Sequence, residues 1–330
     1  MSVTAGFDLG GTHLKYGLVD QAGSILHKDR IATPATATGL MADLRAVWTD
    51  LKARSPEPIG AAGFGFPGLY DVRARRIRQS PHCAGLDEFD LVPALAGVLD
   101  VPFIVDNDAN LAALGEWTYG AGRGASSLIV MTIGTGVGAG IVLEGRIWGG
   151  VRGFAGEIGH VSLNPDGLEC PCGNTGCMET EVSARAIRRR YRDFSEDPGD
   201  PTPEEIHRRA EAGDEAARRA FTEAGTWLGL GLSLLINVIN PEKILVGGGI
   251  MAAGRLLLDP AIAEASRRSY RAAFESCSIK PTALGNDAGL IGAAAGAARE
   301  ARVKTGPFKY FPAPATNGRR TAYQKDEEIS

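Results

Sequence analysis

The chain has 330 residues, more than one hydrophobic core usually serves, so two domains are expected. A formal net charge of −4 gives no support for binding to nucleic acid or to a membrane surface. No basic region precedes an apolar run at the N-terminus, and no apolar run reaches membrane-spanning length, so neither a signal peptide nor a membrane partner is expected. Five cysteines and 44% hydrophobic residues fit a globular protein of the reducing cytoplasm.

The first part of the chain predicts an α/β unit. Residues 3–8 form an apolar run that enters Gly10-Gly11-Thr12, and a second apolar run follows at 14–19. This pattern predicts antiparallel strands joined by a glycine-rich hairpin. Further elements are predicted as helices over 37–53 and 91–99, strands over 59–64 and 102–105, and a helix that begins after 106–108 and runs to about residue 117.

The same pattern begins again in the middle of the chain. Strand-like runs at 127–133 and 137–143 flank Gly134-Thr135-Gly136, an arrangement that echoes residues 3–19 and predicts a duplicated architecture. A third glycine turn, Gly247-Gly248-Gly249, follows a strand-like run at 243–246. Helices are predicted over 183–194, 203–212, 214–237, 260–274 and 288–301, the first of them basic, with its arginines on a solvated face.

Four residues form a candidate metal site: His160, Cys170, Cys172 and Cys177. Thiolate and imidazole groups are the ligands that zinc prefers, and four of them complete a tetrahedral site without an open position for water. Zinc bound here would therefore be structural and not the catalyst. The alternative is a glycine-rich loop with free or disulfide-bonded cysteines, but a Cys-x-Cys pair bridges only with strain.

Two glutamates flank this set of ligands. Glu157 lies three residues before His160 and would share a face with it in a helical turn, and Glu179 lies two residues after the last cysteine. A metal at His160 would hold both acids in place, whereas glutamates elsewhere are most often solvated at the surface.

The three glycine turns follow apolar strands, which favours a nucleotide ligand. Glycine lets backbone N–H groups approach phosphate oxygens, and threonine adds a hydroxyl donor. Asp8, at the end of the first strand, is placed to hold Mg²⁺ beside a polyphosphate, with Lys15 just beyond the hairpin. Residues 63–68 fit the spacing of a dinucleotide-binding loop, but Pro67 lacks a backbone donor and no helix is predicted next, so we reject that interpretation.

Polar residues fill four of the five positions from Asp106 to Asn110, directly after an apolar strand. One Asp or Asn at such a position is the ordinary N-cap of a helix, but a cap uses only one residue. A carboxylate at a strand end could also accept a proton from a substrate hydroxyl, while neighbouring amides hold other hydroxyls. Asp108 is therefore the candidate general base.

Together these pieces resemble the ROK (repressor, open reading frame, kinase) sugar kinases, and most closely their bacterial glucokinase-like members. They run in family order over about residues 4–300. The matching segments are DLGGTHLK at 8–15, GFGFPG at 63–68, VDNDANLAALGE at 105–116, TIGTGVGAGIV at 132–142, GEIGH at 156–160, CPCGNTGCME at 170–179 and VGGGI at 246–250.

The resemblance implies the actin/hexokinase-type (ribonuclease H-like) α/β fold, with ATP and Mg²⁺ in the cleft between two lobes. The smaller lobe would comprise residues 1–116, joined by the helix at 288–301, and the larger lobe, 117–287, would carry the structural zinc loop. The polar tail at 302–330 is expected to be partly disordered.

The resemblance also implies site residues. The contacts to ATP and Mg²⁺ would be Asp8, Gly10, Gly11, Thr12, Lys15, Thr132, Gly134, Thr135, Gly136, Gly247, Gly248 and Gly249. The sugar contacts would be Gly68, Asn107, Asp108, Glu157, His160 and Glu179, with Asp108 as the base. The zinc ligands would be His160, Cys170, Cys172 and Cys177, so His160 would serve zinc and sugar through its two ring nitrogens.

The expected activity is ATP-dependent phosphorylation of the 6-hydroxyl of a hexose, glucose first. One loop departs from the glucokinase-like pattern, because His82 stands where Asn is usual. N-acetylmannosamine, N-acetylglucosamine, mannose and fructose are therefore alternative substrates. A sugar-responsive regulator is the alternative from another class, although such members carry an N-terminal helix-turn-helix segment and the first phosphate loop here begins at Asp8. A homodimer or homotetramer is expected from the family.

Overall fold

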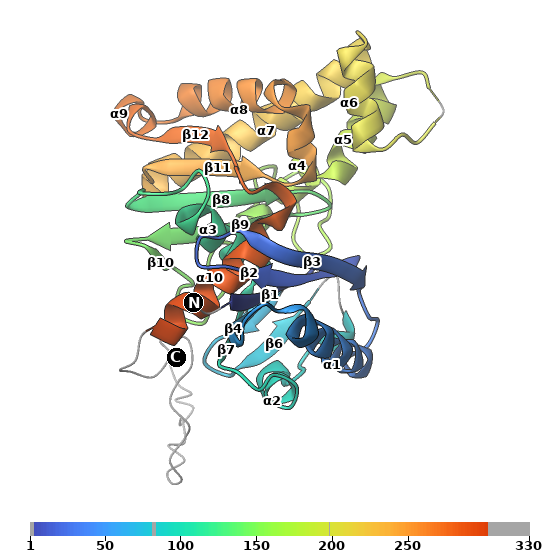
Figure 1. The fold of residues 1–330 in the computed structure, drawn as a ribbon. Coiled ribbons are helices and arrows are strands. Elements are labelled where there is room, and N and C mark those ends of the chain that lie inside the picture. Colours follow the sequence, from blue (N-terminus) through green and yellow to red (C-terminus); the bar gives the residue numbers. More distant parts are fainter. Residues whose placement is uncertain (1–2, 81–83, 198, 303–330) are drawn as a thin grey trace, which may run out of the picture.

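The computed structural model describes residues 3–80, 84–197 and 199–302. His82 and residues 303–330 of the predicted tail lie outside the described residues. The described chain forms two lobes, each built around a mixed sheet of five strands (Figure 1). The predicted two-lobed α/β fold is thereby confirmed, while the predicted boundaries of the lobes in the sequence stay predictions.

The two sheets have the same topology, with strand orders β3-β2-β1-β4-β7 and β10-β9-β8-β11-β12. In each sheet three strands pair antiparallel and two more extend the sheet in parallel. This repetition confirms the duplicated architecture. The strands are β1 (Val3–Leu9), β2 (His13–Val19), β3 (Ile25–Ala32), β4 (Ile59–Phe66), β7 (Phe103–Asn107), β8 (Ser127–Ile133), β9 (Val137–Leu143), β10 (Arg146–Ile147), β11 (Lys243–Gly247) and β12 (Ser278–Pro281).

The outer helices form where apolar residues recur at helical spacing. In α1, Leu40, Leu44 and Leu51 make one buried stripe. α7 ends where Asn240 turns to the left-handed conformation (φ 49°), just before Pro241. These helices are α1 (Ala37–Arg54), α2 (Leu91–Ala96), α4 (Met178–Val182), α5 (Ala184–Phe194), α6 (Pro203–Glu211), α7 (Glu215–Ile239), α8 (Arg255–Arg268) and α9 (Arg271–Glu275), and a small hairpin of β5 (Leu69–Asp71) and β6 (Arg76–Gln79) completes the first lobe.

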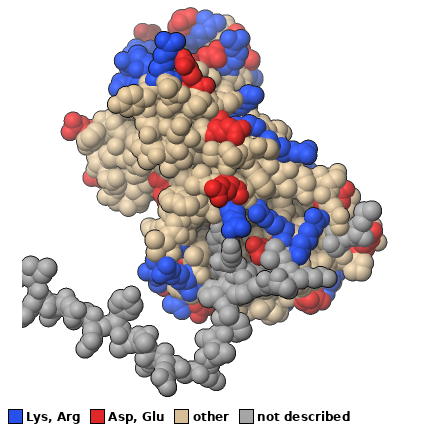
Figure 2. Space-filling view, turned by 90° about the vertical axis from the view of Figure 1, so that its left-hand side faces the viewer, with Lys and Arg blue, Asp and Glu red and all other residues tan. Residues whose placement is uncertain are grey.

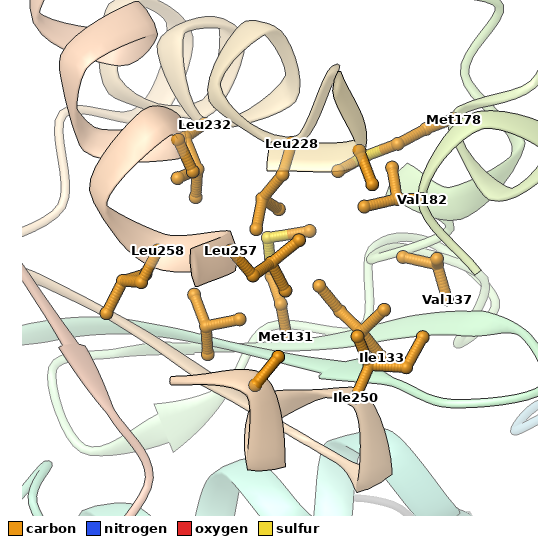
Figure 3. Packing of buried hydrophobic residues seen from close by; sticks show 14 of the residues in the cluster. Met131, Ile133, Val137, Met178, Val182, Leu228, Leu232, Ile250, Leu257 and Leu258 are labelled. Atoms are coloured by element: carbon orange, nitrogen blue, oxygen red, sulfur yellow. The ribbon is translucent and has the colours of Figure 1, made fainter. Parts of the chain in front are cut away.

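The core of the second lobe lies between its sheet and helices α7 and α8 (Figure 3). Met131 and Ile133 of β8 belong to this core together with Leu228 and Leu232 of α7 and Leu257 of α8. All five side chains are fully buried. This apolar layer therefore holds β8 and the hairpin that follows it in a fixed position.

The expectation that no segment is apolar and long enough to cross a membrane is wrong for α7, by length and composition. It has 25 residues, and its most apolar window has a mean hydropathy of 1.3. Half of that window is buried inside the protein, where α7 packs in the core, as in the central helix of a globular domain. The run at 227–238 is short and includes Ser233 and Asn237, but its leucines dominate the mean of the longer window.

Two predicted helices differ from the observed ones. The segment 260–274 divides into α8, which begins at Arg255, and the separate α9. Proline favours helix starts, but Pro260 lies inside α8, where its ring packs against Gly225 of α7. In α5 the arginines are not all solvated, because Arg190 is buried and its Nη2 lies 2.5 Å from Oε2 of Glu181.

The basic side chains of the second lobe lie among acidic ones. Figure 2, which faces the left-hand side of Figure 1, shows blue and red residues interleaved at the upper end of the molecule. Arg188 of α5 pairs with Asp200, and Arg209 of α6 pairs with Asp197. These pairs neutralise much of the positive charge of the two helices.

Two further helices cross between the lobes. α3 (Asp108–Thr118) follows β7 of the first sheet but packs on β8 and β9 of the second. α10 (Ala288–Arg302) follows β12 of the second sheet but packs on β1 and β4 of the first. The two helices touch at Gly292, where an added Cβ would lie 1.7 Å from the carbonyl oxygen of Leu111. Only glycine fits at this crossing.

We expect Gly292→Ala to lower the free energy of unfolding by about 2–3 kcal/mol, because the backbones of α3 and α10 must separate to admit the methyl group. Urea unfolding of both proteins would measure the loss. Gly97→Ala is the matched control, since Gly97 has a φ of −82° and its nearest neighbour, Ala94 O, lies 3.4 Å from the added Cβ. Equal losses in the two variants would contradict the tight crossing.

Candidate functional site

A cleft of ≈ 540 Å³ is lined by residues of both lobes. Several residues singled out in the sequence meet there: Gly68, Asn107, Asp108, Thr132, Gly134, Gly136, Glu157, His160, Cys172, Glu179 and Gly248. Others do not contribute to the lining: Asp8, Gly10, Gly11, Thr12, Lys15, Thr135, Cys170, Cys177, Gly247 and Gly249. The cleft thus gathers the predicted sugar contacts and only parts of the predicted phosphate loops.

Asn107 and Asp108 lie where β7 ends and α3 begins, on the floor of the cleft. Asn107 is the N-cap, because its Oδ1 accepts hydrogen bonds from the backbone N–H groups of Ala109 (2.9 Å) and Asn110 (3.2 Å). Its Nδ2 donates to the carbonyl oxygen of Gly68 (3.1 Å), which ties the β4–β5 turn to α3. Since Asn107 caps the helix, the carboxylate of Asp108 is not needed for that role.

Burial above all, then the nearby carboxylate of Asp8 and, more weakly, that of Glu157 together raise the pKa of Asp108 to about 7, while a hydrogen bond from the N–H of Ala109 opposes the shift. A carboxyl group with this pKa changes its protonation state near neutral pH. It is therefore suited to take a proton from a hydroxyl group during a reaction.

Asp106 stabilises the turn between β7 and α3 beneath the cleft. It is buried, and its Oδ1 accepts from the N–H of Asn107 (2.7 Å) and from Nδ2 of Asn110 (2.9 Å). Burial raises its pKa to about 6. The cluster of four polar residues therefore divides into a buried pair that supports the turn and a pair that faces the cleft.

Glu179 and Glu157 line the opposite wall. Glu179 is buried at the start of α4, where its Oε2 accepts from the N–H of Val137 (3.0 Å) and its Oε1 lies 3.6 Å from Nη2 of Arg185. Glu157 precedes a single helical turn, and its Oε2 lies 4.0 Å from Nε2 of His160. Burial is the main cause that raises the pKa of Glu157.

The other side of the His160 ring faces a cluster of cysteines. Its Nδ1 lies 3.7 Å from Sγ of Cys170, and Sγ of Cys172 lies 3.6 Å from Sγ of Cys177. All four candidate ligand atoms lie within 4.8 Å of one another. Ligands at about 2.3 Å from one tetrahedral ion stand at such separations, so the donor set and its spacing fit zinc.

Asp8 and Lys15 face each other across the first hairpin. Nζ of Lys15 lies 3.4 Å from Oδ2 of Asp8 and donates to the carbonyl oxygen of Asn286 (3.0 Å). Burial raises the pKa of Asp8 although Lys15 opposes the shift. Asp8 is outside the cleft lining but contributes to its electrostatics, since it is the charge that most raises the pKa of Asp108.

The second and third glycine turns pack together beside the cleft. The N–H of Gly134 donates to the carbonyl oxygen of Gly136 (2.9 Å), which closes the β8–β9 turn. Gly248 has a φ of 94°, and an added Cβ would lie 2.2 Å from the carbonyl oxygen of Ile133. The third turn therefore requires glycine because it lies directly against the end of β8.

Sequence reasoning assigned no role to several residues of the site. Asp106 is a support, and Arg185 approaches Glu179 from α5. Gln79, at the end of β6, also lines the cleft. The sequence indicated this role only through the position of Gln79 shortly before His82, in the stretch expected to face the sugar. The remaining lining residues are Pro67, Leu69, Ala109, Ile133, Val137, Gly138 and Ala139.

The arrangement agrees with what comparisons with known proteins show. The model of the ROK family matches residues 4–300. A glucokinase from Halalkalibacterium halodurans is 36% identical over 305 residues, which cover 87% of this chain and 92% of that protein. The crystal structure of a ROK family glucokinase from Streptomyces griseus in complex with glucose and AMPPNP is similar with a TM-score of 0.79 at 32% identity, covering 90% of this chain and 100% of that one.

The similarity also extends to regulators. A xylose repressor from Caldicellulosiruptor bescii is 31% identical over 254 residues, which cover 72% of this chain and 62% of that protein. Enzymes and regulators of this group thus share the fold. The family match spans nearly all described residues, and the chain therefore belongs to the ROK family.

Proposed function

We propose that this chain is an ATP-dependent hexose kinase that transfers the γ-phosphate of ATP to the 6-hydroxyl of glucose. The observation that carries the proposal is the carboxyl group of Asp108, which faces the cleft with a pKa of about 7. Similarity to glucokinases supports the choice of reaction and sugar. The Streptomyces griseus glucokinase is bound to glucose and AMPPNP in its crystal structure, which supports a sugar and a nucleotide as ligands.

In this mechanism Asp108 accepts the proton of the sugar hydroxyl while the hydroxyl oxygen attacks the γ-phosphorus in line. The bond between that phosphorus and the β-phosphate oxygen breaks, and ADP leaves. Glu157 and Glu179 offer acceptors to other sugar hydroxyls, and His160 adds a ring nitrogen. The second hydrogen on Nδ2 of Asn107 remains available, because only one bond to Gly68 is formed.

The three glycine turns, 10–12, 134–136 and 247–249, would hold the phosphates and the adenosine of ATP. Asp8 would hold Mg²⁺, whose charge would offset that of the phosphates. A carboxylate oxygen is the ligand type that Mg²⁺ prefers. A cation beside Asp8 would also offset the energetic cost of burying the charge of this carboxylate. Lys15 would add a second positive charge on the same side.

A structural zinc ion at His160, Cys170, Cys172 and Cys177 belongs to the same proposal. The four ligands connect the segment that carries Glu157 with the start of α4, which carries Glu179. Zinc would therefore hold the sugar-binding wall together without touching the sugar.

A sugar-responsive regulator is the second candidate, because curated relatives include xylose repressors. A kinase for another hexose is the nearer alternative. A coupled assay with ATP and a panel of hexoses tests all three. Glucose turnover supports our proposal, turnover of another hexose alone corrects the substrate, and sugar binding without any turnover favours the regulator.

We expect Asp108→Asn to lower kcat by about two to four orders of magnitude, because the hydroxyl proton loses its acceptor. Glucose affinity, measured by calorimetry without ATP, should stay close to that of the wild type, since Asn keeps the shape of the side chain. Glu204→Gln, at a surface position in α6, is a matched removal of one carboxylate and should leave kcat unchanged. Normal turnover with weakened sugar binding in Asp108→Asn would overturn the role of the base.

The raised pKa of Asp108 also predicts a pH dependence of stability. The folded protein holds this proton up to about pH 7, whereas the unfolded chain releases it near the ordinary value of 3.8. The contribution of Asp108 to stability is therefore greatest at low pH and is lost as pH rises through this window. We expect the Tm of Asp108→Asn to match that of the wild type near pH 4 and to exceed it by about 2–5 °C at pH 8. A constant difference across this range would contradict the burial of the charge.

Cys172→Ser should release zinc and weaken glucose binding by roughly tenfold or more, because the wall with Glu157 and Glu179 loses its tie. Metal analysis and calorimetry measure the two effects on one sample. Cys277→Ser is the control, since Cys277 lies against the core of the second lobe and outside the cluster. A zinc-free variant with normal glucose affinity would show that the metal does not support the sugar site.

A further inference from the structure

Glu116 lies near the end of α3, where its side chain is fully buried. Its Oε1 accepts hydrogen bonds from the backbone N–H groups of Ala283 (2.9 Å) and Leu284 (2.7 Å). Its Oε2 accepts from the N–H of Ala121 (2.9 Å). One carboxylate thus joins the segment that leaves α3 to a segment more than 150 residues away in the sequence.

Burying a carboxylate is costly unless its oxygens are satisfied, and these three donors supply that satisfaction. The surroundings fit the carboxylate closely. An added Cβ at Gly120 would lie 2.1 Å from Oε2 of Glu116, so glycine is needed there for the carboxylate to reach Ala121.

The distant segment is one of the connections between the lobes. Residues 282–287 lead from β12 of the second sheet to α10, which lies on the first sheet (Figure 1). Glu116 holds the beginning of this connection on the side of the second lobe, since α3 packs on β8 and β9.

The end of the same connection is held by the first lobe. The carbonyl oxygen of Asn286 accepts from Nζ of Lys15, and Asp287 pairs with Nζ of Lys28 at 2.7 Å. Between the two held parts stands Gly285, which has a φ of 55° and no atom within 4 Å of an added Cβ. The connection is therefore held by contacts at both ends, whereas Gly285 between them has free space beside it.

We propose that Glu116 is a positioning residue for the kinase reaction: it anchors the connection between the lobes and thereby sets Lys15 and Asp8 relative to Asp108. This rests on the proposed function. α3 carries Asp108 in its first turn and Glu116 in its last, so the helix is a rigid rod between base and anchor. From Glu116 the connection leads to Asn286, and Asn286 holds Lys15 opposite Asp8.

The test is Glu116→Gln, which keeps the size of the side chain. An amide has one oxygen, so in either orientation its NH₂ group faces at least one of the backbone N–H groups and the link between Ala121 and Leu284 is broken. Hydrogen exchange should speed up by about tenfold or more at Ala121 or at Ala283 and Leu284. We expect kcat with glucose and ATP to fall by about 10- to 100-fold, while glucose affinity without ATP changes less than about twofold.

Glu242→Gln is the matched control. Oε2 of Glu242 also accepts from a backbone N–H, that of Ser126, at the other end of the linker after α3, but both residues belong to the second lobe. It should leave kcat and the exchange at Ala283 unchanged. If Glu116→Gln fails to fold, Gly120→Ala displaces the same carboxylate by its added methyl group and should give the same separation of kcat from glucose affinity.

The outcomes separate this inference from the proposed function. Unchanged exchange at all three amides in Glu116→Gln would refute the anchor. Faster exchange with normal kcat would refute the positioning role. Loss of glucose affinity in proportion to kcat would show a general structural defect instead. If the wild type phosphorylates no hexose, the proposed function fails, and the exchange measurement still decides whether Glu116 anchors the connection.

Discussion

The crossing of α3 and α10 is the constraint on which the rest of the structure depends. Each helix starts at a strand of one sheet and packs on the other sheet, so neither lobe is complete without the other. The backbones approach so closely at Gly292 and Leu111 that no side chain fits between them. The helices therefore join the two lobes, and the cleft is lined by residues at strand ends of both sheets. The geometry of the candidate site thus depends on helix packing and not on the loops alone.

Carboxylates line the cleft or lie beside it, whereas no lysine or arginine is among its lining residues in the described part of the chain. Asp8, Asp108 and Glu157 all have a raised pKa, and for each of them burial is the first cause. A site with this balance prefers a ligand that brings positive charge or proton donors. Sugar hydroxyls supply the donors, and Mg²⁺ supplies the charge that must accompany ATP. The electrostatics therefore agree with both ligands of the proposed reaction.

Much of this architecture is predictable from local sequence. Glycine turns after apolar strands located both hairpins, and the spacing of His160 and the cysteines located the metal cluster that the structure brings together. β10 and β12 were not predicted because edge strands carry a weak alternating pattern and their pairing is set by the neighbouring strand. Gln79, Arg185 and Glu116 were beyond local reasoning, since their roles arise from contacts between segments far apart in the chain.

His160 shows how the metal cluster and the cleft depend on each other. Nδ1 faces the cysteines, and Nε2 faces Glu157. A metal bound at Nδ1 requires a lone pair there, so the ring proton of neutral imidazole must reside on Nε2. His160 would then present a donor to the cleft, beside acids that accept hydrogen bonds when they are ionised. A metal at this cluster would thus do more than hold the wall in place, because it would decide which kind of hydrogen bond the wall offers to a ligand in the cleft.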